Sequence, residues 1–110
     1  MTHLKALDSA RAAVAANAGR PATATIYDSE DVRMVVFRLA PGQSVAPHRN
    51  KSTVTLTVLD GSGTISGETE EVMCRPGDVV AYAPNELHGM RAESEDFLLL
   101  AEISPRPGTR

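Results

Sequence analysis

The stretch 45-VAPHRNKSTVTLTVLDG-61 carries the clearest secondary-structure signal in the chain. From residue 53 onward, threonine alternates with Val54, Leu56 and Val58. Because successive side chains of a strand point to opposite faces, the three apolar residues share one face and the threonines share the other. The pattern predicts a strand whose apolar face lies against a core, followed by a turn at Asp60-Gly61.

Similar signals recur on both sides of this strand. Pro41-Gly42 and Pro76-Gly77 suit type II turns, and Ser66-Gly67 marks a further short hairpin. Roughly eight short strands at regular spacing predict an all-β sandwich or barrel. Apart from the strand above, the runs rich in strand-forming residues are ATATIY, VRMVVFRLA, GDVVAYAP, LHGMRA and DFLLLAEI.

Only the N-terminal region has helical periodicity, in the sequence HLKALDSARAAVAANA of residues 3–18. Thr2 is the expected N-cap, Gly19 fits the position just after the helix, and Pro21 prevents its continuation. The alanine-rich stripe is narrow, so we expect this helix to lie on a larger surface. The apolar residues at spacings of three and four are Leu4, Leu7, Ala10 and Val14.

Length and composition predict one small domain. The chain has 110 residues, of which 42% are hydrophobic and 23% are charged, and this size supports a single core. We expect residues 1–21 to form the helix and a linker, residues 22–104 the β barrel, and residues 105–110 a flexible tail.

Charge and cysteine content exclude several function classes. Eleven Lys and Arg against fourteen Asp and Glu give a net charge of -3, which argues against nucleic acid or an anionic membrane as the main partner. A single cysteine, Cys74, cannot form an internal disulfide, and charged residues interrupt any apolar signal segment at the N-terminus. The apolar runs are too short to span a bilayer. We therefore expect a cytoplasmic protein.

The order of glycines and histidines resembles that of the cupin family, whose members are small jelly-roll barrels with two sequence motifs. The first motif is Gly, five residues, His-x-His, three or four residues, Glu, six residues, Gly. Gly42, His48 and Gly61 stand at the first glycine, the first histidine and the last glycine. Asn50 and Val54 stand at the second histidine and the glutamate, so the motif is degenerate.

The second cupin motif is Gly, five residues, Pro-x-Gly, two residues, His. Ten residues separate Gly77 from His88, as in the family, and Asn85 replaces the inner glycine. Asparagine tolerates the left-handed backbone conformation that glycine serves in such a turn, so we expect that conformation here. The resemblance covers about residues 30–104. It implies a small single-domain cupin, an all-β double-stranded β-helix, here with a short N-terminal helix.

In metal-binding cupins, the three histidines and the glutamate hold iron, manganese, zinc or a similar ion inside the barrel. The resemblance makes His48 and His88 the candidate ligands here, for Fe, Mn, Zn, Cu or Ni. The amide of Asn50 is a poor donor beside imidazole, and Val54 offers no donor atom. We therefore expect no tightly held catalytic metal.

These observations predict a small-molecule-binding cupin of unassigned substrate, with its pocket inside the barrel. The imidazoles of that pocket could act as general acid or base or bind a carboxylate. Two alternatives stay open, namely a metal-dependent oxygenase or isomerase using His48 and His88, and a structural or protein-interaction domain with a filled barrel. Resemblance to small cupins also implies a homodimer, in which the helix covers the open end of the barrel or crosses to the second subunit. The expected pocket residues are His48, Asn50, Val54, Leu56, Tyr82, His88 and Met90.

Overall fold

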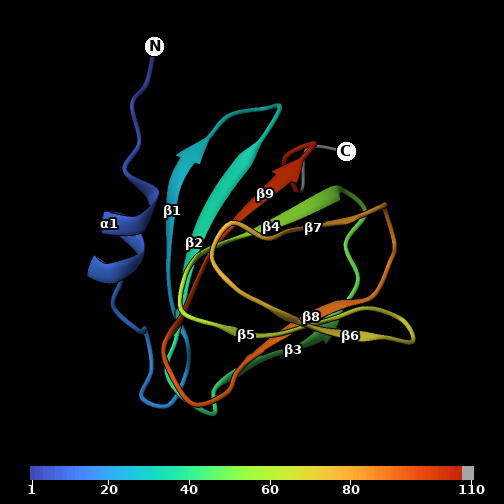
Figure 1. Ribbon diagram of the computed structural model, residues 1–110. Coiled ribbons are helices and arrows are strands. Elements are labelled where there is room, and N and C mark those ends of the chain that lie inside the picture. Colours follow the sequence, from blue (N-terminus) through green and yellow to red (C-terminus); the bar gives the residue numbers. More distant parts are fainter. Residues whose placement is uncertain (108–110) are drawn as a thin grey trace.

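The computed structural model of the protein describes residues 1–107 (Figure 1). Within this range, one helix precedes nine strands. Their bounds are α1 (Ala6–Ala12), β1 (Ala22–Asp28), β2 (Arg33–Leu39), β3 (Ser44–His48), β4 (Thr53–Asp60), β5 (Gly63–Ser66), β6 (Glu71–Cys74), β7 (Val79–Tyr82), β8 (His88–Ala92) and β9 (Phe97–Ser104).

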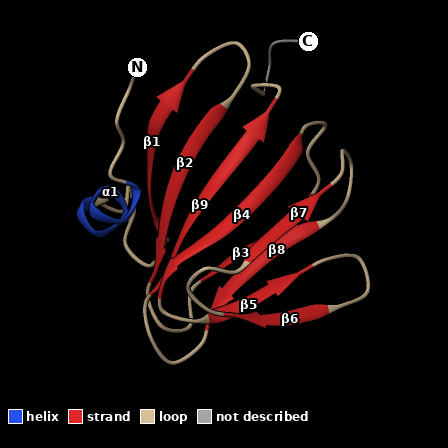
Figure 2. Ribbon diagram, turned by 45° about the horizontal axis from the view of Figure 1, so that its top comes forward, coloured by secondary structure: helices blue, strands red, loops and turns tan. Residues whose placement is uncertain are grey.

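The strands form two antiparallel sheets, which confirms the predicted all-β fold class. The five-stranded sheet has the order β1-β2-β9-β4-β7, and the four-stranded sheet has the order β3-β8-β5-β6. Figure 2 shows the first sheet as a fan of strands, with the second sheet beside and below it. Neighbours such as β2 and β9 are far apart in sequence, so the chain crosses repeatedly between the two sheets.

The main core lies between the sheets. Val54, Leu56 and Val58 of β4 are all at most 3% exposed, so the alternation in the sequence predicted the buried face of this strand correctly. Phe97 and Leu99 of β9 are fully buried beside them. The other buried residues of this cluster are Leu39, Ile65, Cys74, Tyr82, Met90, Ala92 and Ala101.

The barrel has two different ends. At the closed end lie the four connections of residues 40–43, 61–62, 75–78 and 93–96, on the left of Figure 1. At the mouth lie the three loops of residues 49–52, 67–70 and 83–87, on the right. Both cupin-like histidines adjoin the mouth, because His48 ends β3 and His88 begins β8.

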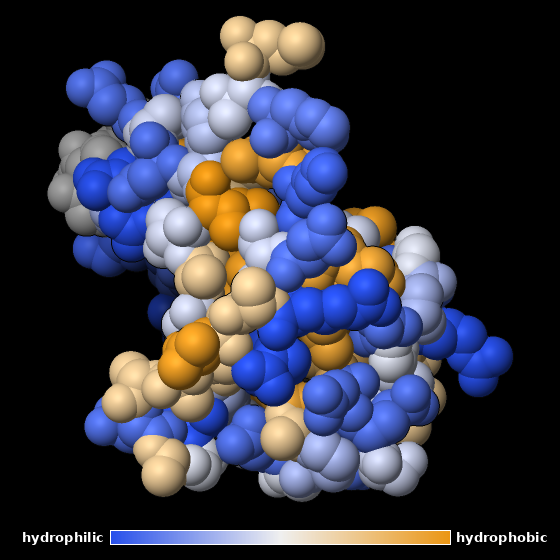
Figure 3. Space-filling view, turned by 90° about the vertical axis from the view of Figure 1, so that its left-hand side faces the viewer, coloured by the Kyte–Doolittle hydropathy of each residue, from blue (hydrophilic) through white to orange (hydrophobic). Residues whose placement is uncertain are grey.

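Helix α1 covers the outer face of the five-stranded sheet and not the open end of the barrel (Figure 1). Ala10 is fully buried there against Val36 and Leu98, and Leu7 packs at the edge of the same cluster. This second apolar layer is separate from the core between the sheets. Figure 3 shows the face that carries α1, where hydrophobic side chains remain visible between hydrophilic ones.

The helix is shorter than the periodicity predicted. It starts after Lys5 instead of Thr2, and Ala13 is already extended, with φ -63° and ψ 141°. The guanidinium of Arg38 donates a hydrogen bond to the carbonyl of Ala13 over 2.6 Å. This tertiary contact outweighs the high helix propensity of the following alanines. Val14, predicted to be in the apolar stripe, is 80% exposed.

The predicted turn conformations are confirmed. Gly42 and Gly77 have φ values of 80° and 95°, and Asn85 has φ 71°. The N–H of Asn85 donates to the carbonyl of Asn50 over 2.7 Å, which joins two loops of the mouth. The left-handed asparagine therefore shapes the site directly.

The segment predicted to be a flexible tail is described for residues 105–107 only, and residues 108–110 lie outside the described residues. The Pro105 carbonyl accepts a hydrogen bond from the hydroxyl of Ser52, and Arg106 pairs with Asp28. No helix in the described part of the chain is long and apolar enough to cross a membrane.

Candidate functional site

The pairing of β3 with β8 brings the two predicted histidines together. His48 and His88 are cross-strand partners, and their ring centroids lie 4.1 Å apart in an edge-on arrangement with an interplanar angle of 60°. His88 points inward and is only 6% exposed, while His48 is exposed at the end of its strand. The pair therefore extends from the surface of the mouth into the interior.

Backbone carbonyls fix the orientation of both rings. Nδ1 of His48 lies 3.1 Å from the carbonyl oxygen of Ala46, and Nδ1 of His88 lies 3.4 Å from that of Glu86. When each Nδ1–H donates to its carbonyl, each Nε2 keeps a free lone pair. Burial and the neighbouring His48 lower the pKa of His88, against a smaller opposite effect of the Glu86 carbonyl. His88 is therefore a neutral acceptor at neutral pH.

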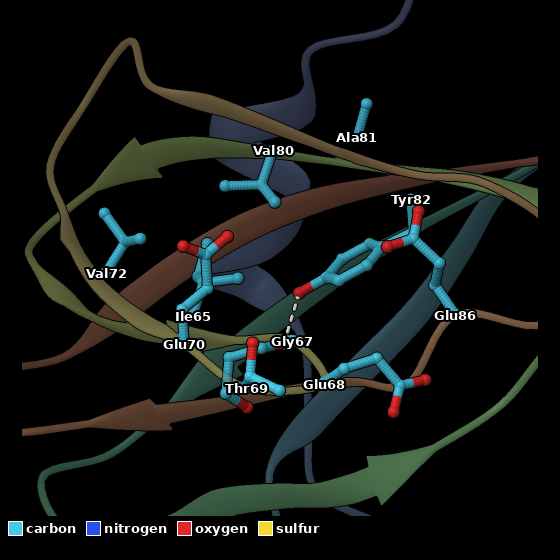
Figure 4. A pocket seen from close by; sticks show the side chains of 11 residues that line it. Ile65, Gly67, Glu68, Thr69, Glu70, Val72, Val80, Ala81, Tyr82 and Glu86 are labelled. Atoms are coloured by element: carbon cyan, nitrogen blue, oxygen red, sulfur yellow. Dashed lines mark hydrogen bonds between the residues drawn. The ribbon is translucent and has the colours of Figure 1, made fainter.

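Tyr82 connects the two sheets beside this pair. It comes from β7, and its ring centroid lies 5.0 Å from that of His88 with a tilt of 43°. Its hydroxyl donates a hydrogen bond to the carbonyl of Ser66 on β5 over 2.7 Å (Figure 4). Burial, first of all, raises the pKa of Tyr82 to about 12, so the side chain stays a neutral donor.

Tyr82 also lines a cavity of about 190 Å³. Figure 4 shows Ile65, Val80 and the Tyr82 ring facing one another across it. Its rim is polar and carries three glutamates. The complete lining is Ile65, Ser66, Gly67, Glu68, Thr69, Glu70, Val72, Val80, Ala81, Tyr82 and Glu86. A larger hollow of about 760 Å³ lies outside the barrel, between residues 16–21 and the start of β3.

An ion pair joins the three loops of the mouth. Arg49 binds both carboxylate oxygens of Glu68 and also donates to the carbonyl of Asn85 over 2.9 Å. The same carboxylate accepts the N–H of Leu87 over 3.1 Å. The hydrogen bonds from Arg49 and then from Leu87 hold the pKa of Glu68 below its usual value. Glu68 lies 19 residues from Arg49 along the chain, too far for any local pattern to reveal the contact.

The other predicted pocket residues have different environments. Val54, Leu56 and Met90 are buried in the core between the sheets. The side-chain oxygen of Asn50 accepts the N–H of Ser52 over 2.8 Å, so it closes a local turn. Of the seven residues predicted to line the pocket, Tyr82 alone lines the cavity at the mouth.

The similarity to known proteins agrees with this architecture. The family model described as "Cupin domain" matches residues 35–103. The chain belongs to the cupin family. No curated protein matches it.

Several solved structures share the cupin fold of this chain. The TT1209 protein of Thermus thermophilus is 27% identical with a TM-score of 0.83, and the match covers 96% of this chain and 100% of that chain. KdgF from Halomonas sp. is 22% identical with a TM-score of 0.78, over 86% and 87% of the two chains. A predicted oxalate decarboxylase from Thermotoga maritima is 24% identical with a TM-score of 0.73, over 77% and 80%.

The residues of this cupin do not fit the four-ligand metal centre of the family. His48 and His88 supply two nitrogen donors, whereas the amide oxygen of Asn50 is already bonded to Ser52 and Val54 has no donor atom. Among the described residues, no group of three or more His, Cys, Asp and Glu side chains could hold a metal ion. A pair of imidazoles alone lacks the carboxylate and the third nitrogen that complete such a centre.

Proposed function

We propose that this cupin binds a compact small molecule in the cavity at the mouth of the barrel, without a tightly held metal. The observation that carries the proposal is a partly open cavity between the sheets, whose inner wall is formed by Ile65, Val80 and the ring of Tyr82 and whose rim is polar. A concave apolar surface with a few convergent polar groups is the usual form of a ligand site.

The volume and charge of the cavity restrict the ligand. At about 190 Å³ the cavity is smaller than the ~300–1,000 Å³ of ordinary ligand pockets, which favours a compact molecule. Glu68, Glu70 and Glu86 stand on its rim, and none of its described lining residues is Lys, Arg or His. Within residues 1–107, Glu68 is the only one of these three glutamates with a guanidinium partner. A neutral or cationic apolar molecule therefore suits the site better than an anion.

The similar structures do not supply an activity. KdgF and the predicted oxalate decarboxylase are both less than 25% identical to this chain and carry different names, so they support the fold and leave the substrate open. A metal-dependent enzyme using His48 and His88, and a purely structural domain, are the outcomes that would replace the proposal.

The charge preference is tested with three probes that share one apolar body, namely benzyl alcohol, benzylammonium and benzoate. In methyl NMR spectra of the wild-type protein, we expect the first two to shift the signals of Ile65, Val72 and Val80, and benzoate to leave them unchanged. If none of the three probes moves these methyl signals, the proposed site is wrong.

Two valine variants serve as a matched pair. Val72→Trp fills the cavity and should abolish the shifts, because Val72 lines it. Val79→Trp should preserve them, because Val79 is 60% exposed and is not part of the lining. Metal analysis of untagged protein purified without chelators completes the test. Near-stoichiometric metal that disappears in the His48→Ala and His88→Ala variants would establish the metal-dependent alternative.

A further inference from the structure

We propose that Tyr82 is the specificity-determining residue of this ligand site, because its ring separates the cavity from the imidazole pair and so limits the length of the bound molecule. The inference rests on the proposed function, since it concerns the same cavity. It adds a residue with a defined role and a class of molecules that the site excludes.

The ring of Tyr82 contacts both the imidazole pair and the cavity. It lies 5.0 Å from the ring of His88, and it also lines the cavity together with Ile65 and Val80. Neither His48 nor His88 is among the residues that line the cavity. The imidazole pair and the cavity are thus neighbours that share the tyrosine as a common wall.

Two features hold this wall in place. The backbone of Tyr82 is fixed by the β4–β7 ladder, where the residue pairs with Val54. Its hydroxyl is fixed to the opposite sheet by the hydrogen bond to the Ser66 carbonyl. Because the residue is only 4% exposed, its ring has little freedom to change rotamer in a close-packed interior.

The wall has a chemical consequence for the ligand. A compact molecule in the cavity meets the face of a phenol ring and does not reach the free Nε2 atoms of the histidines. A longer molecule with a hydroxyl or ammonium group at its far end could donate a hydrogen bond to an imidazole, but the ring occupies its path. Removing the ring should open the cavity toward the imidazole pair and admit the longer molecule.

The test compares benzyl alcohol with 4-phenyl-1-butanol as probes. In the wild-type protein, benzyl alcohol should shift the methyl signals of Ile65 and Val80 without moving the ring Cε1–H signal of His88. The longer alcohol should bind wild-type protein weakly. In Tyr82→Ala its affinity should rise about tenfold, the scale expected when a pocket gains room for further methylene groups, and the His88 signal should now move.

Tyr82→Phe is the matched conservative variant, because it keeps the ring and loses only the hydroxyl. It should retain the wild-type preference for the shorter alcohol, which a merely destabilising substitution would not do. If Tyr82→Ala does not fold, Tyr82→Leu replaces it, since leucine keeps apolar volume without the reach of the ring. A His88 signal that moves with benzyl alcohol in the wild-type protein would overturn the partition and leave the proposed function intact.

If no probe binds the wild-type cavity, the proposed function fails. Whether the Tyr82 ring separates the cavity from the imidazole pair is then tested without a ligand. The rate at which diethylpyrocarbonate modifies His88 reports the access of a small molecule to that ring. Tyr82→Ala should raise this rate several-fold relative to the exposed His3, whereas Tyr82→Phe should leave it unchanged. Equal rates in the wild-type protein and in Tyr82→Ala would overturn the partition.

Discussion

The closed end and the mouth of the barrel are built from the same strands and differ in what lies between them. At the closed end, residues 61–63 pack against residues 96–97 with no room for a further atom. A Cβ placed on Gly63 would lie 2.4 Å from the ring of Phe97, and one placed on Gly61 would lie 1.8 Å from the carbonyl oxygen of Asp96. At the mouth, a Cβ on Gly67 would meet nothing within 4 Å.

Because of this difference, we expect the closed end to contribute mainly to stability and the mouth mainly to binding. Where residues 61–63 meet residues 96–97, the closed end is so tightly packed that Gly61 and Gly63 leave no room for a larger side chain. The mouth contains the cavity, the imidazole pair and the Arg49–Glu68 ion pair, which are polar, partly exposed and joined through loops. Substitutions at the mouth should therefore alter binding with small effects on folding, and substitutions at the closed end should do the reverse.

The largest expected effect is that of Gly61→Ala. Gly61 and Gly42 both belong to the closed end and both have positive φ, at 73° and 80°, so alanine costs about 1–2 kcal/mol of backbone strain at either position. A Cβ at Gly42 meets nothing within 4 Å, whereas one at Gly61 collides with the backbone of Asp96. Overpacking of this kind adds about 1–3 kcal/mol or more. Urea denaturation of Gly61→Ala and Gly42→Ala measures the difference between their free energies of unfolding. Equal losses in the two variants would contradict the close packing around Gly61.

The next effect concerns the mouth and depends on pH. Because the pKa of His88 is lowered in the folded protein, the folded state binds fewer protons than the unfolded state between that lowered pKa and about 6.5. The free energy of unfolding should thus be highest above pH 6.5 and should decline as the pH falls through this window. The His88→Asn variant should lose that decline. Denaturation midpoints measured at pH 7.5 and pH 5.5 give the test, and identical pH profiles for the two proteins would contradict it.

Periodicity and motif spacing predicted much of this architecture because they report on backbone geometry. The alternation in β4 identified its buried face, and the spacing of the second motif located Asn85 in its left-handed turn. The match to both motifs also placed His48 and His88 at corresponding positions, and the strand register brings their rings together. The buried face of β4 and the turn at Asn85 depend on short local segments, whereas the meeting of the two histidines depends on the pairing of β3 with β8, which the family motifs imply.

Features that depend on tertiary contacts could not be predicted in this way. The end of α1 depends on Arg38 of the distant strand β2, which donates a hydrogen bond to the carbonyl of Ala13. Tyr82 and Ser66, which both line the cavity, are joined across the two sheets by a hydrogen bond that nothing in either local sequence indicates. The predicted pocket consequently contained Val54 and Leu56, which share the correct face of β4 but lie within the filled core.

The smallest expected effect is that of Glu68→Gln, which should loosen the mouth with little change in global stability because exposed ion pairs contribute little. Its clearest sign should be faster hydrogen exchange of the Leu87 amide, which donates to the Glu68 carboxylate. Glu70→Gln is the matched control from the same hairpin, since the Glu70 side chain makes no hydrogen bond or ion pair among the described residues. Because Arg49 and Leu87 lower the pKa of Glu68, protection of this amide in the wild-type protein should persist below about pH 4.3 and disappear only as Glu68 protonates. Exchange at Leu87 that is the same in both variants would show that the three loops are held by their own turns and not by this carboxylate.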